Sequence, residues 1–523
     1  MPNEFSYYVK SSIPPAVLYV FLLQKLTDYE KTILGTLQGL LAGSSDRQIY
    51  FLDDHHPDYG VWLEELESKC ELYYDADISQ LIGQFSDKIY GFITYSDEDS
   101  ILPSVSLAGI KNAIVVHESL KSDMIRLGLS ELFDMRGKDD RFVFNHYWKN
   151  SLNHRMVIEQ KPENTPYLFD YAVMTNSLIF SAYDDSLREE IMSKLEPDSA
   201  VLGWGDARDG EDKFVAPSSQ KGSFVIPADW SLNLSVLSSK KSEPVKQNKF
   251  PLKYEDHVHY VCFMMSDGDN IQWEKGRLIN DKKLWASSHR GKFSIGWALS
   301  PSLYDLAPSV VAKYYETASE GEVRDGFVAG PSGNGYMYPS MYPDEVLSLH
   351  TMRLNDYMVK MDLSVVEIID FDSFYNLDIW KKYLDQPNIR GLFYLEYSLH
   401  NEHKGRILWS NNKPIISVKE MLWDGIKGCD VKSVSDHINQ ASRDVKSADA
   451  YSLVLVHVWS KKNGTLDALN KLVKRFNSDV RIVPPDTFVD LISHNLRGCN
   501  DVILNDICVS ELESTHKTGV SAF

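Results

Sequence analysis

The sequence predicts an α/β protein, with a C-terminal (β/α)7–8 TIM-like barrel preceded by an α/β N-terminal region of one or two small domains. Two observations carry this prediction. From residue 257 onward, eight apolar runs of strand length alternate with helical patterns, and such alternation over about 250 residues is typical of a barrel. The first 145 residues show the same alternation on a smaller scale, which indicates a layered α/β unit.

The N-terminal half divides into two predicted units. The first covers residues 1–145 and has apolar runs at 16–23, 48–52, 91–95 and 113–117. Polar, proline-containing sequence then interrupts the rhythm, and a second unit is expected over residues 160–240. A stretch rich in Ser, Lys and Pro at 238–249 reads as the linker to the rest of the chain.

The barrel is expected over residues 250–500, followed by a tail at 501–523. Its predicted strands lie at 259–265, 293–299, 327–329, 364–369, 391–396, 414–418, 451–458 and 480–483. Helical patterns between them lie at 303–318, 344–361, 431–445 and 465–476. The chain of 523 residues is long enough for a barrel with an accessory region.

Composition excludes several classes of partner. The formal net charge is −20, with 74 acidic against 54 basic residues, so a nucleic acid would be repelled and is not expected as a partner. The five cysteines form no C-x-x-C pair, which argues against a zinc ribbon or a dense disulfide framework. There is no P-loop and no complete G-x-G-x-x-G, so we expect no cofactor. The oligomeric state is left open.

The sequence alone favours a cytoplasmic location. The early apolar run at 16–23 lacks the small-residue exit of a signal peptide. No apolar run approaches the ~20 residues that a membrane helix needs, so no membrane insertion is expected.

The stretch Gly-Asn-Gly-Tyr-Met-Tyr-Pro at 333–339 combines two glycines and two tyrosines in one short loop. Glycine lets the backbone approach a ligand closely, and tyrosine offers a flat apolar face with a hydroxyl at its edge. Sugars need both, so the loop is a candidate ligand platform. The alternative is a tight turn whose tyrosines cover the core.

A second motif, Ser-Asp-Gly-Asp-Asn at 266–270, follows the apolar run 259–265. This puts Asp267 and Asp269 at the carboxyl end of a predicted barrel strand, where such barrels keep their catalytic groups. The alternative is that these residues cap the helix that follows.

Together with Gly-Trp-Ala-Leu-Ser-Pro at 296–301, these motifs resemble the GxGYxYP family, whose members are described as glycoside hydrolases. The resemblance extends to the N-terminal half through Leu-Gln-Gly-Leu at 37–40, Val-Leu-Gly-Trp-Gly-Asp at 201–206, Asp-Trp at 229–230 and Asn-Leu-Ser at 233–235. It implies a carbohydrate-active barrel behind an α/β N-terminal region, and it favours export rather than a cytoplasmic location.

The chemistry expected of such a site is cleavage of a glycosidic bond by paired carboxylates, one acting as acid and the other on the anomeric carbon or a water. Glu396 is the preferred acid, because burial at the end of strand 391–396 would raise its pKa. Its alternative role is a salt bridge. The catalytic candidates are Asp267, Asp269, Glu396 and Asp370.

Substrate-binding candidates are polar or aromatic residues that follow predicted strands. They are Asn270, Trp273, Ser300, Ser332, Asn334, Tyr336, Tyr338, His457, Asp206 and Trp230. The last two belong to the N-terminal half, where an interdomain interface is the alternative role.

Two other functions stay open. His457 in Leu-Val-His, with Asp267 and Asp269, faintly resembles the metal site of polysaccharide deacetylases. Those enzymes need an H-x-x-x-H pair, whereas this chain has His400-Asn-Glu-His403, so no metal ligand is assigned. A barrel that binds carbohydrate without catalysis is the third possibility.

Overall fold

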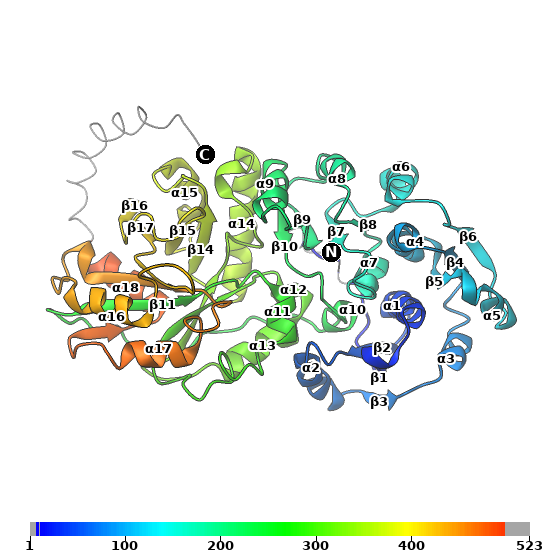
Figure 1. Ribbon diagram of the computed structural model, residues 1–523, viewed down its shortest axis with the longest axis horizontal. Coiled ribbons are helices and arrows are strands. Elements are labelled where there is room, and N and C mark those ends of the chain that lie inside the picture. The colour runs from blue at the N-terminus through cyan, green and yellow to red at the C-terminus, as the bar shows by residue number, and fades with distance from the viewer. Residues whose placement is uncertain (1–6, 10, 497–523) are drawn as a thin grey trace.

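The computed structural model describes residues 7–9 and 11–496 (Figure 1). The predicted tail at 501–523 lies outside these residues. None of the helices within them combines the length and apolar character needed to cross a bilayer.

The first 151 residues contain two separate three-stranded parallel sheets. In the first sheet the order is β2-β1-β3, and in the second it is β5-β4-β6. The strands are β1 (Val17–Leu22), β2 (Arg47–Leu52), β3 (Glu71–Tyr74), β4 (Gly91–Tyr95), β5 (Ala113–His117) and β6 (Glu131–Asp134). The helices are α1 (Asp28–Ala42), α2 (Asp58–Glu67), α3 (Ile78–Gln84), α4 (Glu98–Lys111), α5 (Lys121–Arg126) and α6 (Asp140–Ser151).

A third N-terminal sheet, here called the third sheet, is parallel and has the order β10-β9-β7-β8. Its strands are β7 (Met156–Gln160), β8 (Ile179–Ser181), β9 (Ser199–Gly203) and β10 (Ser223–Ile226). The helices are α7 (Phe169–Thr175), α8 (Asp185–Met192), α9 (Asp212–Gln220) and α10 (Leu234–Leu237). In Figure 1, β9 and β10 lie between the first two sheets and the C-terminal region.

The C-terminal region is built on one ten-stranded sheet with the order β16-β17-β15-β14-β13-β12-β11-β19-β18, and β20 pairs with β11. Its strand pairs are parallel except β16 with β17. The strands are β11 (His259–Met265), β12 (Ile295–Leu299), β13 (Asp325–Ala329), β14 (Val365–Asp370), β15 (Gly391–Glu396), β16 (Ile407–Ser410), β17 (Lys413–Ser417), β18 (Glu420–Leu422), β19 (Tyr451–Val456) and β20 (Val480–Ile482).

The helices of this region follow the predicted alternation. They are α11 (Ile271–Gly276), α12 (Leu303–Leu306), α13 (Pro308–Thr317), α14 (Asp344–Lys360), α15 (Leu377–Leu384), α16 (Val431–Gln440), α17 (Leu466–Val473) and α18 (Pro485–Leu496). One predicted helix, 303–318, is divided at Ala307, because the residue before a proline disfavours helical backbone. Short 3₁₀ turns are η1 (Leu23–Lys25), η2 (Glu118–Leu120), η3 (Pro339–Met341) and η4 (Ala448–Ala450).

The C-terminal sheet is strongly curled. Strands β17 and β18 stand far apart in the strand order, yet only Val418 and Lys419 separate them in the chain. The Val418 N–H donates to Tyr394 of β15, at 3.1 Å, and the Lys419 N–H donates to Leu453 of β19, at 2.9 Å. One continuous segment therefore touches both ends of the row of strands.

A complete eight-stranded TIM barrel is not confirmed. The predicted eighth strand exists as β20, but it is three residues long and pairs only with residues His259 to Val261 at the start of β11. Further along β11, Met264 and Met265 pair with β12. Because β20 is this short and pairs only with the start of β11, it does not form a full barrel strand.

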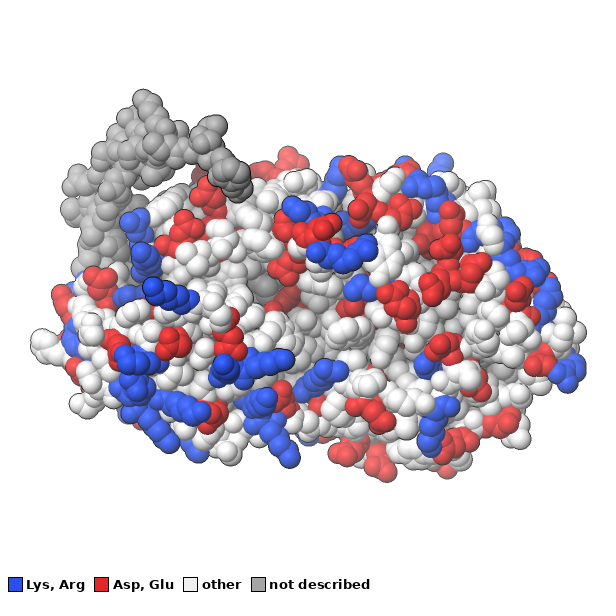
Figure 2. All heavy atoms as spheres, in the orientation of Figure 1, with Lys and Arg blue, Asp and Glu red and all other residues white. Residues whose placement is uncertain are grey.

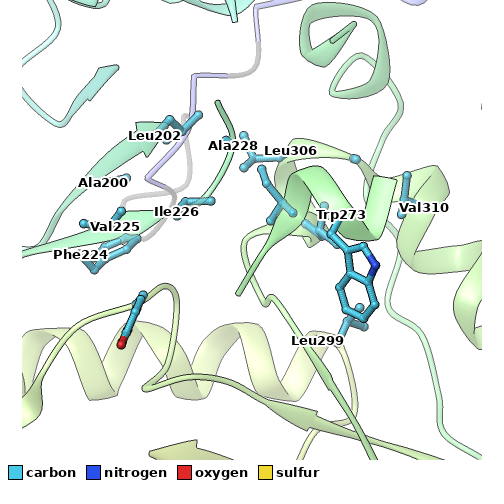
Figure 3. Packing of buried hydrophobic residues seen from close by; sticks show 14 of the residues in the cluster. Ala200, Leu202, Phe224, Val225, Ile226, Ala228, Trp273, Leu299, Leu306 and Val310 are labelled. Carbon is cyan, nitrogen blue, oxygen red and sulfur yellow. The ribbon is translucent and has the colours of Figure 1, made fainter. Parts of the chain in front are cut away.

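The Gly-Asn-Gly-Tyr-Met-Tyr-Pro loop joins the C-terminal sheet to the third sheet. Tyr336 and Val225 of β10 exchange two backbone hydrogen bonds, of 2.7 and 2.9 Å, as an isolated antiparallel bridge. A Cβ at Gly335 would lie 2.5 Å from the Phe224 ring and 2.8 Å from the Val225 carbonyl oxygen, so only glycine fits there. Figure 3 shows Phe224, Val225 and Ile226 in this packed region.

A buried polar network reinforces the same junction. The Asn334 amide donates to the Tyr7 hydroxyl, at 2.7 Å, and that hydroxyl donates to Asp198, at 2.6 Å. His350 lies 2.7 Å from the other oxygen of Asp198. These side chains are buried, and the apolar core runs without interruption from the third sheet into the C-terminal sheet. The two parts therefore share one interior.

We expect Gly335→Ala to destabilise the protein, because its Cβ would overlap Phe224 and the backbone of Val225. Overpacking of this kind costs about 1–3 kcal/mol, measurable as a lower free energy of unfolding in urea. Gly60→Ala is the matched control, since a Cβ there meets nothing within 4 Å and alanine favours the helix. Equal stability of both variants would show that the loop can move away from β10.

Candidate active site

A cavity of about 550 Å³ opens where the C-terminal sheet faces the third sheet. On the side of the C-terminal sheet, it is lined by residues at or near the carboxyl ends of β11, β13, β14, β15, β18 and β19. On the N-terminal side, the lining residues are Lys161, Trp204, Glu211, Pro227, Asp229 and Trp230. The carboxyl ends of parallel strands are where α/β folds commonly build their binding sites.

The turn after β11 brings two carboxylates into this cavity. Asp267 has a positive φ of 66°, and its carboxylate accepts hydrogen bonds from the Trp459 indole, at 2.8 Å, and from the Ser266 hydroxyl. A Cβ on Gly268 would lie 2.0 Å from the backbone of Ala298, so glycine lets the turn press against β12. Asp269 is buried, and burial together with the nearby charge of Asp267 raises its pKa well above the ordinary value.

Glu367 of β14 supplies a third carboxyl group. It is buried, and no described residue forms a hydrogen bond with its Oε2 atom. Burial raises its pKa well above the ordinary value, and the charges of Asp267 and Asp269 add to this rise. A buried polar atom without a partner is costly in a structural role, so Glu367 is suited to meeting a ligand.

Glu211 supplies the fourth carboxyl group, from the opposite wall of the cavity. It directly precedes α9, and its Oε1 accepts a hydrogen bond of 2.6 Å from the Tyr336 hydroxyl. Burial raises the pKa of Glu211, the hydrogen bond from Tyr336 opposes the rise, and the charge of Asp267 adds to it. The Gly-rich loop thus holds a carboxyl group of the N-terminal region in front of the C-terminal sheet.

Aromatic and imidazole rings form the remaining walls. Trp423 stacks on His457 with ring centroids 3.5 Å apart and planes 4° from parallel, and His400 lies beside them in the cavity lining. Burial lowers the pKa of both histidines, which favours neutral rings. Trp230 and Trp459 are 43% and 48% exposed at the rim. Flat faces with polar edges suit stacking on sugar rings.

Six of the predicted site residues line this cavity. They are Asp267, Asp269, Asn270, Tyr336, His457 and Trp230. Asn270 also caps α11 by accepting a hydrogen bond from the Trp273 N–H, at 3.1 Å, so the capping role proposed for this turn coexists with a place in the cavity.

The predicted acid Glu396 does not line the cavity. Burial raises its pKa, but His403 at 3.6 Å, the Asp372 N–H and the Tyr394 hydroxyl outweigh this, so the pKa lies below the ordinary value. The pKa rise expected from the sequence is therefore wrong. A carboxylate that is stabilised as the anion is poorly suited to donate a proton.

Asp370 also lies outside the lining, although burial raises its pKa to about 6. Its oxygens accept hydrogen bonds from the Ser340 N–H and hydroxyl and from the Ser373 hydroxyl. These bonds tie the end of β14 to the segment after the Gly-rich loop, which is a structural task.

The other predicted binding residues outside the lining have partners elsewhere. Trp273 packs edge-on against Trp459, the Ser300 N–H donates to Glu274, and the Ser332 hydroxyl donates to the Ile369 carbonyl. Asn334 belongs to the buried network described above, Tyr338 packs against Phe371 and Tyr397, and Asp206 pairs with Arg208.

Four further residues line the cavity without a role predicted from the sequence, namely Glu211, Gln272, Lys161 and Trp423. Trp423 directly follows β18, so a search of strand ends could have found it had that short strand been recognised. Glu211 does not follow a strand and has no sequence pattern that marks it as a site residue. It reaches the cavity because the bridge between Tyr336 and Val225 brings another part of the chain there.

Across residues 7–9 and 11–496, no three His, Cys, Asp or Glu side chains are grouped so that they could hold a metal ion. Among the carboxyl groups of the cavity, Asp267 is held by tryptophan and serine donors and Glu211 by a tyrosine.

The α/β fold with a carboxyl-lined cavity is compatible with hydrolytic chemistry, and comparison with known proteins supports a hydrolase. The chain belongs to the GxGYxYP family. Residues 257–493 match the model described as "GxGYxYP putative glycoside hydrolase C-terminal domain". Residues 17–87, 89–151 and 154–239 match the first, second and third N-terminal domains of that family. The resemblance in the sequence motifs is thereby confirmed.

A solved structure has the same fold. It is a crystal structure described as a "putative hydrolase from Bacteroides thetaiotaomicron VPI-5482", 33% identical to this chain, with a TM-score of 0.84. The match covers 95% of this chain and 98% of the other. A search of curated proteins found no match.

The buried Glu367 predicts a pH-dependent stability. Its folded pKa lies above the ordinary 4.5, so its contribution to stability is complete below that pH and is lost as the pH rises through the folded value. Glu367→Gln does not titrate, and its free energy of unfolding should therefore rise relative to wild type between about pH 5 and about pH 8. Urea unfolding at both pH values measures this.

The control is Glu67→Gln, which removes an exposed carboxylate at the end of α2. Its difference from wild type should be the same at both pH values. A constant difference for Glu367→Gln as well would mean that Glu367 ionises freely in the folded protein.

Proposed function

We propose that this protein is a glycoside hydrolase that cleaves a glycosidic bond in the cavity between the two sheets. The observation that carries the proposal is that carboxyl groups line both walls. Asp267, Asp269 and Glu367 come from the C-terminal sheet, and Glu211 comes from the N-terminal side. Glycosidic cleavage needs two carboxyl groups on either side of the bond, and the exposed tryptophans at the rim supply stacking surfaces.

The environments of the carboxyl groups suggest their roles. Glu211 is the proposed general acid, because burial raises its pKa and Tyr336 holds only one of its two oxygens. Asp267 is the proposed partner that acts on the anomeric carbon or on a water, since Trp459 and Ser266 both donate to its carboxylate and orient it.

Asp269 and Glu367 have raised pKa values and are proposed to be protonated in the resting enzyme. In that form they donate hydrogen bonds to sugar hydroxyls. They also reduce the number of negative charges close to Asp267, since carboxyl groups that share a site do not all ionise together.

We expect Asp267→Asn and Glu211→Gln each to lower glycoside hydrolysis by about 10²–10⁴-fold, because each change removes a proton-transfer or charged group without changing shape. Release of reducing sugar from a panel of oligosaccharides and 4-nitrophenyl glycosides measures the effect. Asp87→Asn and Glu67→Gln, both exposed and outside the cavity, are the matched controls. Full activity in either cavity variant would remove that residue from the mechanism.

The same assay separates the alternatives. A metal-dependent hydrolase would lose activity on treatment with EDTA and regain it with added zinc, whereas hydrolysis by paired carboxyl groups would not respond. Binding of oligosaccharides without release of any product would instead favour a carbohydrate-binding protein.

The hydrogen bond between Tyr336 and Glu211 gives a signed pH prediction. This bond lowers the pKa of Glu211, so Tyr336→Phe should raise that pKa further. An acid must carry its proton to act, and the basic limb of the pH profile of kcat/KM should therefore move to higher pH. Tyr90→Phe, at a tyrosine 72% exposed, is the control and should leave the profile in place. A shift to lower pH would contradict the assignment of Glu211 as the acid.

A further inference from the structure

A second cavity, of about 420 Å³, lies on the surface of the C-terminal region and is lined largely by lysines. We call it the lysine cleft. Its residues are Lys282, Lys283, Ser287, Ser288, His289, Lys461, Lys462, Thr465, Asp467 and Lys471. Figure 2 shows basic side chains gathered on the face of the molecule over α17.

The lysine cleft is built from the same two chain segments as the candidate active cavity. After β11, residues 266–272 reach the active cavity and residues 282–289 reach the lysine cleft. After β19, His457 and Trp459 line the first cavity, while Lys461 and Lys462 line the second. The Leu466 N–H donates to the Lys283 carbonyl, at 3.0 Å, and ties the two segments together. Because Lys461 follows Trp459 by only two residues, the lysines are within reach of a ligand that extends past Trp459.

The positive charge of the cleft is only partly compensated by the protein, since Asp281 and Asp424 lie beside it and accept hydrogen bonds from the backbone N–H groups of Lys283 and Lys462. Lys471 pairs with Asp467 at 2.6 Å, and Asp467 is the one carboxylate among the residues that line the cleft. The other four lysines are exposed, and within the described residues their ammonium groups form no ion pair. Like charges held close together repel one another. An anionic ligand would relieve this repulsion, in a chain whose overall charge is −20.

The neighbouring carboxyl groups need not exclude an anionic ligand. Asp269, Glu367 and Glu211 all have raised pKa values, and in the protonated form they add no negative charge. An acidic chain could then enter the active cavity while its anionic groups lie among the lysines.

We infer that the lysine cleft binds the carboxylate or sulfate groups of an acidic polysaccharide whose adjoining sugar occupies the active cavity. This inference rests on the proposed glycoside hydrolase function and assigns its substrate class. A glycan accounts for the cleft better than a nucleic acid, because the basic cleft is local and the whole chain carries a net charge of −20. In addition, the rim tryptophan Trp459 lies on the segment that joins the two sites.

Binding is tested first, with the full-length protein and its Asp267→Asn variant, so that the measurement does not depend on cleavage. Affinity electrophoresis in gels containing polygalacturonate, dextran sulfate or neutral dextran gives a Kd for each polymer. We expect retardation by an acidic polymer and not by dextran, and the two acidic gels distinguish a carboxylate from a sulfate ligand. Raising NaCl from about 50 to about 300 mM should weaken the binding, because salt screens exposed charges.

The variant that tests the site replaces Lys282, Lys283, Lys461 and Lys462 by glutamine. Loss of four exposed charge pairs should weaken binding of the acidic polymer by about tenfold or more. The control replaces Lys69 and Lys446, which are exposed and lie outside the cleft, and it should bind like wild type. A melting curve equal to that of wild type confirms that the fourfold variant is folded.

Three results of the binding experiments would overturn the inference. They are unchanged binding in the fourfold variant, equal retardation by dextran, and equally tight binding of a DNA duplex, which would indicate a general polyanion surface. Failure of the proposed function gives a different pattern, in which acidic polymers bind through the lysines but no glycan is cleaved by the wild type. Cleavage of neutral glycans with full activity in the fourfold variant would leave the function standing and remove only the substrate assignment.

Discussion

The candidate active site depends on one antiparallel bridge, between Tyr336 of the Gly-rich loop and Val225 at the edge of the third sheet. This bridge satisfies backbone groups on both sides and leaves no space for a side chain at Gly335. The Tyr336 hydroxyl then meets Glu211, and the cavity acquires its second wall. Backbone hydrogen bonds are strongly directional, so a single bridge can set how two sheets face each other.

The buried network around Asp198 supports this arrangement. Burial raises the pKa of Asp198, but His350, Tyr7 and Arg353 outweigh the effect and keep it below the ordinary value. The network joins the N-terminal segment, the third sheet and α14. Breaking one member would leave a buried charge without its partner, which is far more costly than losing an exposed pair. The buried network around Asp198 therefore helps to hold the Gly-rich loop in position.

The cavity itself is electrostatically unfavourable. Four of its carboxyl groups, including Asp229, have raised pKa values, and one oxygen of Glu367 has no partner among the described residues. Such features lower stability, and they concentrate at sites whose chemistry needs them. The tight turn at Gly268 has the same character, because it presses the two aspartates toward their neighbours and accepts only glycine. Stability here is supplied by the continuous apolar core on either side.

Local patterns in the sequence determined most of the elements and part of the site. The apolar runs of β11 and β15 were placed with their observed bounds, because a buried parallel strand is apolar along its whole length. Asp267, Asp269 and Asn270 were found because they directly follow such a strand. The family was also evident, since its motifs are short and contiguous.

Only the tertiary structure decided which groups meet. Glu396 follows a strand as the aspartates do, yet its neighbours Tyr394, His403 and the Asp372 N–H turn it into a stabilised anion outside the cavity. Glu211 has no pattern around it and reaches the site through a bridge to another sheet. The sequence patterns did not predict the curl of the C-terminal sheet either. The curl arises because β17 pairs with β15 and β18 pairs with β19, although only a few residues separate β17 from β18. Periodicity reports how a segment is buried, whereas pairing and pKa values depend on contacts between segments that lie far apart in the chain.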